Sequence, residues 1–467
     1  MTRRRELAAG AALTLVAVLG WAVVRTYPNY DSYFALDWGR ELVAGHRPGY
    51  DAYAAPTPHP LWNLVAALAG LAGRSGERLI VLVAVLALVA LIWGVARLGT
   101  ACFGRWAGLV AAVLVGSSFG FLLYAAKGYV DIPFIALVTW AGALEQERPQ
   151  RGWPVMLLLA LAGLLRPEAW LLALLYLAWL RRRTPLALAL ALAGPALWVA
   201  SDWVITGDPL FSLHSTQGTV AALGRNVPAR HVPRTLVTFL SGTVRPPVLA
   251  LGVVGAVLAV RRYGWRPLAV PLALLLAGVA VFVGFALVGL SAQSRYLTVP
   301  AMATCVFAAH ALLGWRELRG EDPWRARWRA GAAIVVVLSV IAGAILLPHS
   351  ASKLRAEVRF VRDVHDDELA LLTDPRVEPC RPIIFPTFRG VPDGRWLIDR
   401  PQGAIVAATE PHGPGGLHVF VPPWASLKAK IRLGNAAGIP QSTNQRQERF
   451  PLVASHGVWV ARGGPCR

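Results

Sequence analysis

The chain has 467 residues, of which 55% are hydrophobic and only 15% are charged, and its mean hydropathy is +0.50. Soluble proteins of this length are rarely so apolar, so the composition argues against an ordinary soluble enzyme and indicates an integral membrane protein. The formal net charge is +20, but the sequence lacks zinc-finger spacing and RNP-like motifs, so we expect no nucleic-acid partner. The arginines are better explained by membrane topology and by contacts with lipid phosphates.

The N-terminal segment has the features of a membrane anchor. Three arginines, Arg3 to Arg5, precede an apolar segment at 7–25. This charge pattern resembles that of a signal peptide, but a cleavage site with small residues does not follow. We therefore expect an uncleaved signal-anchor helix with its N-terminus in the cytoplasm.

The next segment, 27–61, is rich in acidic and aromatic residues and opens a long outer loop at 26–78. Asp31 follows the first span directly, so it could cap a helix at 32–43 or take part in catalysis. Asp37 and Glu41 are four residues apart and are predicted to form a solvated, salt-bridged helix face, with Asp37 a weaker candidate for substrate contact. His59 lies between two prolines and is either structural or a ligand for a metal or substrate.

Ten further apolar segments complete a predicted set of eleven membrane spans. The apolar segment at 60–72 is shorter than the roughly 20 residues needed to cross a bilayer, so we interpret it as an interfacial or re-entrant helix. The Arg-rich short loops then all fall on the cytoplasmic side, as the positive-inside rule requires. The eleven predicted spans are 7–25, 79–97, 107–125, 131–144, 153–165, 169–180, 185–204, 246–260, 267–290, 296–313 and 331–348.

The loops assigned to the outer face carry most of the remaining candidate site residues. Arg166 and Glu168 flank Pro167 and form either a simple charged turn or a group that orients substrate or binds phosphate. Arg295 is either an interfacial arginine or a clamp on a lipid phosphate, which a guanidinium can bind in bidentate fashion. The candidates on these loops are Lys127, Asp131, Arg166, Glu168, Arg230, Arg234, Arg295 and Tyr296.

After residue 348 the composition becomes polar and rich in proline. The patterning predicts a helix at 353–372 and short strands at 382–385, 404–408, 417–421 and 457–461. We therefore expect a transmembrane domain at 1–348 and a small extracytoplasmic α/β domain at 349–467. Its two cysteines, Cys380 and Cys466, are predicted to form a disulfide in an oxidising compartment, with two free thiols as the alternative.

Several short motifs together resemble the GT-C superfamily of membrane glycosyltransferases. The resemblance covers most of residues 1–348 and is closest to protein mannosyltransferases, aminoarabinose transferases and cell-wall arabinosyltransferases. The motifs, in order, are Asp31, Gly45, Pro58-His59-Pro60-Leu61, Phe103-Gly104-Arg105, Tyr129-Val130-Asp131, Leu165-Arg166-Pro167-Glu168 and Arg295-Tyr296.

This resemblance implies a polytopic plasma-membrane enzyme that transfers a hexosyl or pentosyl group from a polyprenyl-phosphate donor to an extracytoplasmic acceptor, with inversion. Asp31 would be the general base, and Asp131 and Glu168 would orient the acceptor or base. Arg295, with Arg230 or Arg234, would hold the lipid phosphate. Asp31 is followed by Ser32 and not by a second acid, and an Asp-x-Asp motif is absent at either acid. No cofactor is therefore certain, and a divalent metal is the alternative.

Two other functions remain open from the sequence. A transporter or lipid flippase would place charges within its spans and show inverted repeats, and neither feature is clear here. A non-catalytic envelope-assembly protein with a degenerate site would keep the same motifs without activity. Walker A, Rossmann, HExxH and GxSxG motifs are absent, which argues against a nucleotide-driven pump and the common hydrolases.

Overall fold

The computed structural model describes residues 3–222, 227–410, 416–420 and 450–463, and it divides into two compact units. The first unit comprises Met1–Gly20, Thr57–Trp62 and Leu82–Ala342. The second unit comprises Trp21–Pro56, Asn63–Val81 and Gly343–Arg467. Four helices run from one unit into the other: α1 (Arg3–Val23), α3 (Pro60–Gly70), α4 (Gly76–Phe103) and α16 (Pro323–Leu372).

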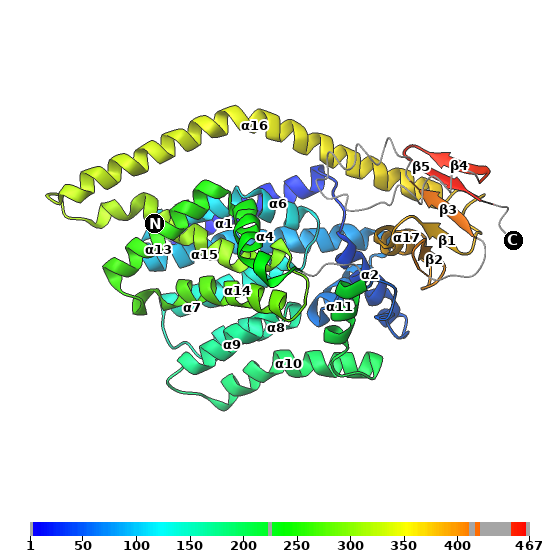
Figure 1. Ribbon diagram of the computed structural model, residues 1–467, viewed down its shortest axis with the longest axis horizontal. Helices are drawn as coiled ribbons and strands as arrows, with labels where there is room; N and C mark the ends of the chain where they lie inside the picture. The colour runs from blue at the N-terminus through cyan, green and yellow to red at the C-terminus, as the bar shows by residue number, and fades with distance from the viewer. Residues whose placement is uncertain (1–2, 223–226, 411–415, 421–449, 464–467) are drawn as a thin grey trace. The chain divides into compact units, whose positions relative to one another are not determined.

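The first unit is a bundle of apolar helices arranged around α15 (Thr298–Leu313). The apolar segment Ser294–Glu317, which contains α15, is 89% buried, and α15 packs against α5, α13 and α14. Figure 1 shows α13 and α14 beside α15. A Cβ at Gly255 of α13 would clash with the carbonyl oxygen of Phe307, so glycine allows these two helices to approach closely. The other helices of this unit are α5 (Arg105–Gly116), α6 (Phe119–Ala126), α7 (Asp131–Glu147), α8 (Trp153–Leu165), α9 (Glu168–Trp179), α10 (Pro185–Thr206), α11 (Phe211–Ala222), α12 (Val232–Val244), α13 (Pro246–Tyr263) and α14 (Ala269–Leu287).

Ten of the eleven predicted spans each fall on one helix, the span 107–125 is divided between α5 and α6, and the number of membrane crossings is not confirmed. Within the described residues, six helices are long and apolar enough to cross a membrane, or seven if α5 and α6, which are bent by 58°, form one span. Helices α8 and α9 are apolar but have only 13 and 12 residues. Helix α3 has 11 residues, a length that agrees with the predicted short helix at 60–72.

The second unit contains a five-stranded mixed sheet with strand order β2-β1-β3-β5-β4. Strand β1 pairs in parallel with β2 and β3, whereas β5 pairs antiparallel with β3 and β4. The sheet core includes Ile383, Phe385, Val419 and Trp459, and Cys380 is buried with them. The strands are β1 (Ile383–Phe385), β2 (Ile405–Ala407), β3 (Leu417–Phe420), β4 (Leu452–His456) and β5 (Trp459–Arg462).

The C-terminal elements agree with four predicted strands and add others that were not predicted, among them a 3-10 helix at Phe388–Gly390. The predicted helix at 353–372 is the end of α16, and position 421 of the third predicted strand lies outside the described residues. The structure adds β4 and α17 (Val391–Ile398), which packs against β2 and against α2 (Tyr30–Val43). The division of the chain at residue 348 stays a prediction, as does the disulfide, because Cys466 lies outside the described residues.

Candidate active site

Three helix ends of the first unit bring together one arginine and two acids. Arg166 follows α8 in an extended conformation, with φ −154° and ψ 134°, as a residue before proline favours. Pro167 separates it from α9, which begins at Glu168, and α7 begins at Asp131. The sequence therefore places Asp131 and Glu168 in the first turns of two helices, where the helix dipole favours negative charge.

These residues form a buried ion-pair cluster, which we call the Arg166 cluster: Asp131, Arg166 and Glu168. Arg166 Nη1 pairs with Asp131 Oδ1, and Arg166 Nε donates to Glu168 Oε1 at 2.9 Å. Asp131 is fully buried and Arg166 is 3% exposed. Because isolated charges are costly to bury, this arginine and the two carboxylates depend on each other.

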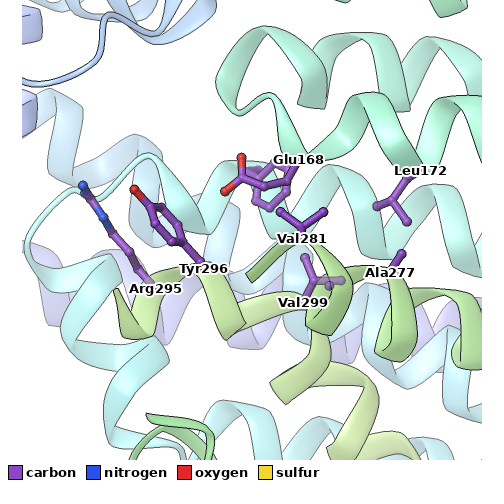
Figure 2. Close-up of a pocket in the computed structure, with 9 residues that line it drawn as sticks. Glu168, Leu172, Ala277, Val281, Arg295, Tyr296 and Val299 are labelled. Carbon is purple, nitrogen blue, oxygen red and sulfur yellow. The ribbon is translucent and has the colours of Figure 1, made fainter. Parts of the chain in front are cut away.

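Tyr296 and Arg295 extend the cluster from the turn at Ser294–Leu297, just before α15. The Arg166 guanidinium carbon lies 4.7 Å from the centre of the Tyr296 ring, and that of Arg295 lies 5.9 Å from it. Figure 2 shows Tyr296 between Arg295 and Glu168. The Tyr296 ring therefore contacts two cations, an arrangement that stabilises both guanidinium groups.

A small pocket lies beside these residues and has a charged side and an apolar side. Glu168, Arg295 and Tyr296 line one side, and residues of α9, α14 and α15 line the other, among them Leu172, Val281 and Val299 (Figure 2). Its volume is about 10 Å³, enough for about one water molecule. A sugar would fit only if the pocket widens. Glu168 Oε2 is buried and has no hydrogen-bond partner among the described residues.

The other candidates of the first unit have varied surroundings. His59 packs edge-on against Trp198, with ring centres 5.8 Å apart. Lys127 caps the C-terminus of α6. Arg230 and Arg234 are exposed and form no ion pair with a carboxylate in the described part of the chain. Ion pairs and ring contacts of the described residues link Asp131, Arg166, Glu168, Arg295 and Tyr296.

Asp31 lies in the second unit, in the first turn of α2, and it does not cap that helix. The cap is Asn29, whose side-chain oxygen accepts hydrogen bonds from the backbone nitrogens of Asp31 at 2.8 Å and Ser32 at 3.3 Å. The capping role considered for Asp31 is therefore wrong. Its carboxylate still gains from its place in the first turn of a helix.

Asp37 and Glu41 were predicted to form a solvated, salt-bridged face; the ion pairs are present, but the prediction of a solvated face is wrong. Asp37 is fully buried. The guanidinium of Arg395, on α17, lies 3.6 Å from the Asp37 carboxylate and 2.6 Å from the Glu41 carboxylate. Arg40 also donates to Asp37 at 3.0 Å. Burial raises the pKa of Asp37 from its ordinary value of 3.8 to about 7, although Arg395 and Arg40 oppose the rise. We call Asp37, Glu41 and Arg395 the Arg395 cluster.

Sequence reasoning missed Arg395, Tyr124 and Ser294. Tyr124 and Ser294 are hydrogen-bonded at 3.1 Å beside Arg295, and only the position of Ser294 next to the Arg-Tyr motif could have drawn attention to it. Arg395 carries no local signal, because its partners precede it by more than 350 residues. In the described residues, no group of three or more His, Cys, Asp or Glu side chains could hold a metal ion.

Residues 56–205 match the family model for dolichyl-phosphate-mannose-protein mannosyltransferases. A search of curated proteins gives no match. The fold is similar to two crystal structures of ArnT from Cupriavidus metallidurans. The one bound to undecaprenyl phosphate has 13% identity and a TM-score of 0.57 and covers 97% of this chain and 99% of that one. The apo structure has 15% identity and a TM-score of 0.51 and covers 97% and 98%.

An oligosaccharyltransferase from Archaeoglobus fulgidus also matches, with 12% identity and a TM-score of 0.49, over 86% of this chain and 64% of that one. At such identities the ArnT structures show a shared fold. The mannosyltransferase model matches the region that includes Asp131, Arg166 and Glu168. The family match over residues 56–205 and the similarity of the fold to ArnT both support the resemblance to the GT-C superfamily of membrane glycosyltransferases.

Proposed function

We propose that the protein transfers a sugar from a polyprenyl-phosphate donor to a hydroxyl of an extracytoplasmic acceptor, with inversion at the anomeric carbon. The observation that carries this proposal is the Arg166 cluster, which meets Arg295 and Tyr296 beside a pocket with an apolar side. A fixed cation next to apolar helices suits a phosphate attached to a lipid chain. The similarity to a structure bound to undecaprenyl phosphate supports the same donor class.

In the proposed reaction the acceptor oxygen bonds to the anomeric carbon as the bond from that carbon to the phosphate oxygen breaks. Asp31 takes the proton of the acceptor hydroxyl as general base. Arg295 stabilises the negative charge that develops on the departing lipid phosphate, with Arg230 or Arg234 as a second cation. Asp131 and Glu168 orient the acceptor and are themselves held by Arg166.

The proposed location is the plasma membrane, with the N-terminus in the cytoplasm and residues 349–467 outside. The Arg-rich loops support this orientation through the positive-inside rule. Reporter fusions at Lys127 and Arg182 test it. We expect Lys127 outside and Arg182 inside, and the reverse result would overturn the assignment.

The test of function uses the purified full chain in nanodiscs with polyprenyl phosphate carrying radiolabelled mannose or arabinose. We expect Asp31→Asn to lower transfer by about 10²- to 10⁴-fold, the usual contribution of a general base. Asp51→Asn is the matched control, because Asp51 is an exposed acid of the same outer loop. Transfer that survives Asp31→Asn would overturn the mechanism. A chelator added to the wild type checks the alternative of a divalent metal.

A further inference from the structure

A second cavity, of about 690 Å³, lies within the second unit, where α1 ends and the last third of α16 runs beside it. Its apolar floor includes Val23, Val24 and Val358. Four arginines, Arg25, Arg355, Arg359 and Arg362, also line it, and we call it the arginine groove. A cavity of this size is typical of small-molecule and cofactor sites.

The arginines of α16 project to one side of the helix. Arg355, Arg359 and Arg362 are spaced by four and three residues, which places them on one helical face. Arg362 pairs with Asp363 at 2.9 Å. In the part of the chain that the structure describes, Arg25, Arg355 and Arg359 have no carboxylate partner within 4 Å.

The acids at the other end of the groove are already bound to the protein. Asp366 accepts a hydrogen bond from the Tyr27 hydroxyl at 3.2 Å, and Asp367 accepts one from the backbone nitrogen of Val458 at 3.0 Å. Asp363 is the partner of Arg362. Four arginines and three aspartates line the groove, so its net charge is positive, and of these acids only Asp363 forms an ion pair with an arginine of the groove among the described residues.

Arg78 fixes the wall of the groove that carries Arg25. Its guanidinium lies over the Trp21 ring at 4.9 Å and donates to the carbonyl oxygen of Thr26 at 3.0 Å. The Trp21 indole in turn donates to the Arg78 carbonyl at 3.0 Å. These contacts hold both sides of Arg25, so its side chain starts from a defined backbone position.

The groove also lies at the ends of two apolar helices. The apolar window of α16 is Pro323–Ile345, and a helical rise of about 1.5 Å per residue places Arg355 about 15 Å beyond Ile345. Arg25 follows the end of α1 by two residues. Lipid headgroups extend about 5–8 Å beyond the hydrocarbon core, so Arg25 lies near their level and the backbone of Arg355 lies on the water side of it. Lipid phosphates match arginine in charge and geometry.

We propose that the arginine groove binds the phosphate headgroup of an anionic phospholipid from the surrounding bilayer. The guanidinium groups of Arg25, Arg355 and Arg359 hold the phosphate, and the valine floor contacts the adjoining glycerol and upper acyl chain. The site is separate from the Arg166 cluster, which belongs to the first unit, and its occupancy does not depend on sugar transfer.

The test compares phosphatidylglycerol, phosphatidylcholine and inorganic phosphate as probes for the purified full chain in detergent. Retained lipid is counted by native mass spectrometry, and the melting temperature is recorded with each probe. We expect the wild type to retain phosphatidylglycerol in preference to phosphatidylcholine. Arg355→Gln/Arg359→Gln should weaken that binding by about 10- to 30-fold, since each basic residue near a lipid surface contributes about a factor of five. The double variant Arg355→Lys/Arg359→Lys, which keeps the charge, should weaken phosphatidylglycerol binding less than the glutamine variant does.

The control is Arg74→Gln/Arg381→Gln, which removes the same charge at two exposed arginines of the same unit outside the groove. It should bind phosphatidylglycerol like the wild type. Equal retention of the two lipids, or a groove variant that binds like the control, would overturn the proposal. A melting shift with inorganic phosphate as large as that with phosphatidylglycerol would identify a free-phosphate site instead. Asp31→Asn should keep lipid binding, which separates this proposal from the proposed activity.

Discussion

The Arg166 cluster and the Arg395 cluster have the same composition, one buried arginine with two acids, but they differ in how the chain builds them. Arg166 and Glu168 are neighbours in sequence, and the cluster adjoins a pocket together with Arg295. Arg395 instead joins two acids one turn apart on α2 to a helix beside the C-terminal sheet. The contrast teaches that buried ion pairs alone do not identify a site. Each cluster has a further arginine beside it, Arg295 or Arg40. The first cluster is the candidate site because one of its own acids, Glu168, lines a pocket together with Arg295 and Tyr296.

The largest expected effect concerns the pH dependence of the Arg395 cluster. The pKa of Asp37 is about 7 in the folded protein and 3.8 ordinarily. Between pH 3.8 and about pH 7 the carboxyl is therefore protonated in the folded protein and ionised in the unfolded chain. Stability should fall by up to about 4 kcal/mol as pH rises through this range. Arg395, Arg40, Glu41 and Asp393 all act on this group.

The substitution Asp37→Asn should remove this contribution to the dependence of the free energy of unfolding on pH. The measurement is the unfolding of the purified protein in detergent from about pH 5 to about pH 8. Asp51→Asn, which changes an exposed acid, should leave the slope as in the wild type. Equal slopes for Asp37→Asn and the wild type would mean that Asp37 does not titrate in this range.

The second prediction compares the same substitution, arginine to lysine, at Arg166 and at Arg395. Arg166→Lys keeps the charge but loses the fork that pairs with two carboxylates, so transfer should fall by about 100-fold. Arg395→Lys makes the same change in the other cluster, and its transfer rate per folded molecule should stay within about threefold of the wild type. Both rates are measured where circular dichroism shows folded protein. Equal losses would break the distinction between the two clusters.

Next in size is the Tyr296 ring. Tyr296→Leu removes the ring that lies 4.7 Å from the Arg166 guanidinium, and a desolvated cation–π contact contributes about 2 kcal/mol. We expect transfer to fall by about 10- to 30-fold on this account. Tyr296→Phe keeps the ring and should stay near the wild type. A large loss with Phe would show that the hydroxyl, and not the ring, is what matters.

The smallest expected effect distinguishes Asn29 from Asp31. Asn29→Ala removes the cap of α2 and should lower the free energy of unfolding by about 1 kcal/mol. Asn29→Ser keeps a capping oxygen and should lower the free energy of unfolding by at most a few tenths of a kcal/mol. Asp31→Asn should change stability little while it lowers transfer. A stability loss from Asp31→Asn as large as that from Asn29→Ala would return the capping role to Asp31.

The sequence predicted the features that depend on neighbouring residues. Apolar runs and prolines located the helices, and the Arg-Pro-Glu turn and the Arg-Tyr motif located most of the Arg166 cluster. It could not predict that Asp37 is buried, because the burial depends on Arg395 in a distant short helix. Strand β4 was missed although it pairs with β5 across a tight turn. The number of crossings was not fixed either, because α8 and α9 are short and α5 and α6 are bent.

The most direct test of the central claim measures two products of one reaction in the purified wild type and Asp131→Asn. The labelled polyprenyl-phosphate sugar is supplied in vesicles, and transferred sugar, released polyprenyl phosphate and labelled lipid moved across the bilayer are counted together. We predict equal amounts of transferred sugar and released lipid phosphate in the wild type, and a loss of about 100-fold or more in Asp131→Asn. Movement of intact labelled lipid without transfer would contradict the account and indicate a flippase.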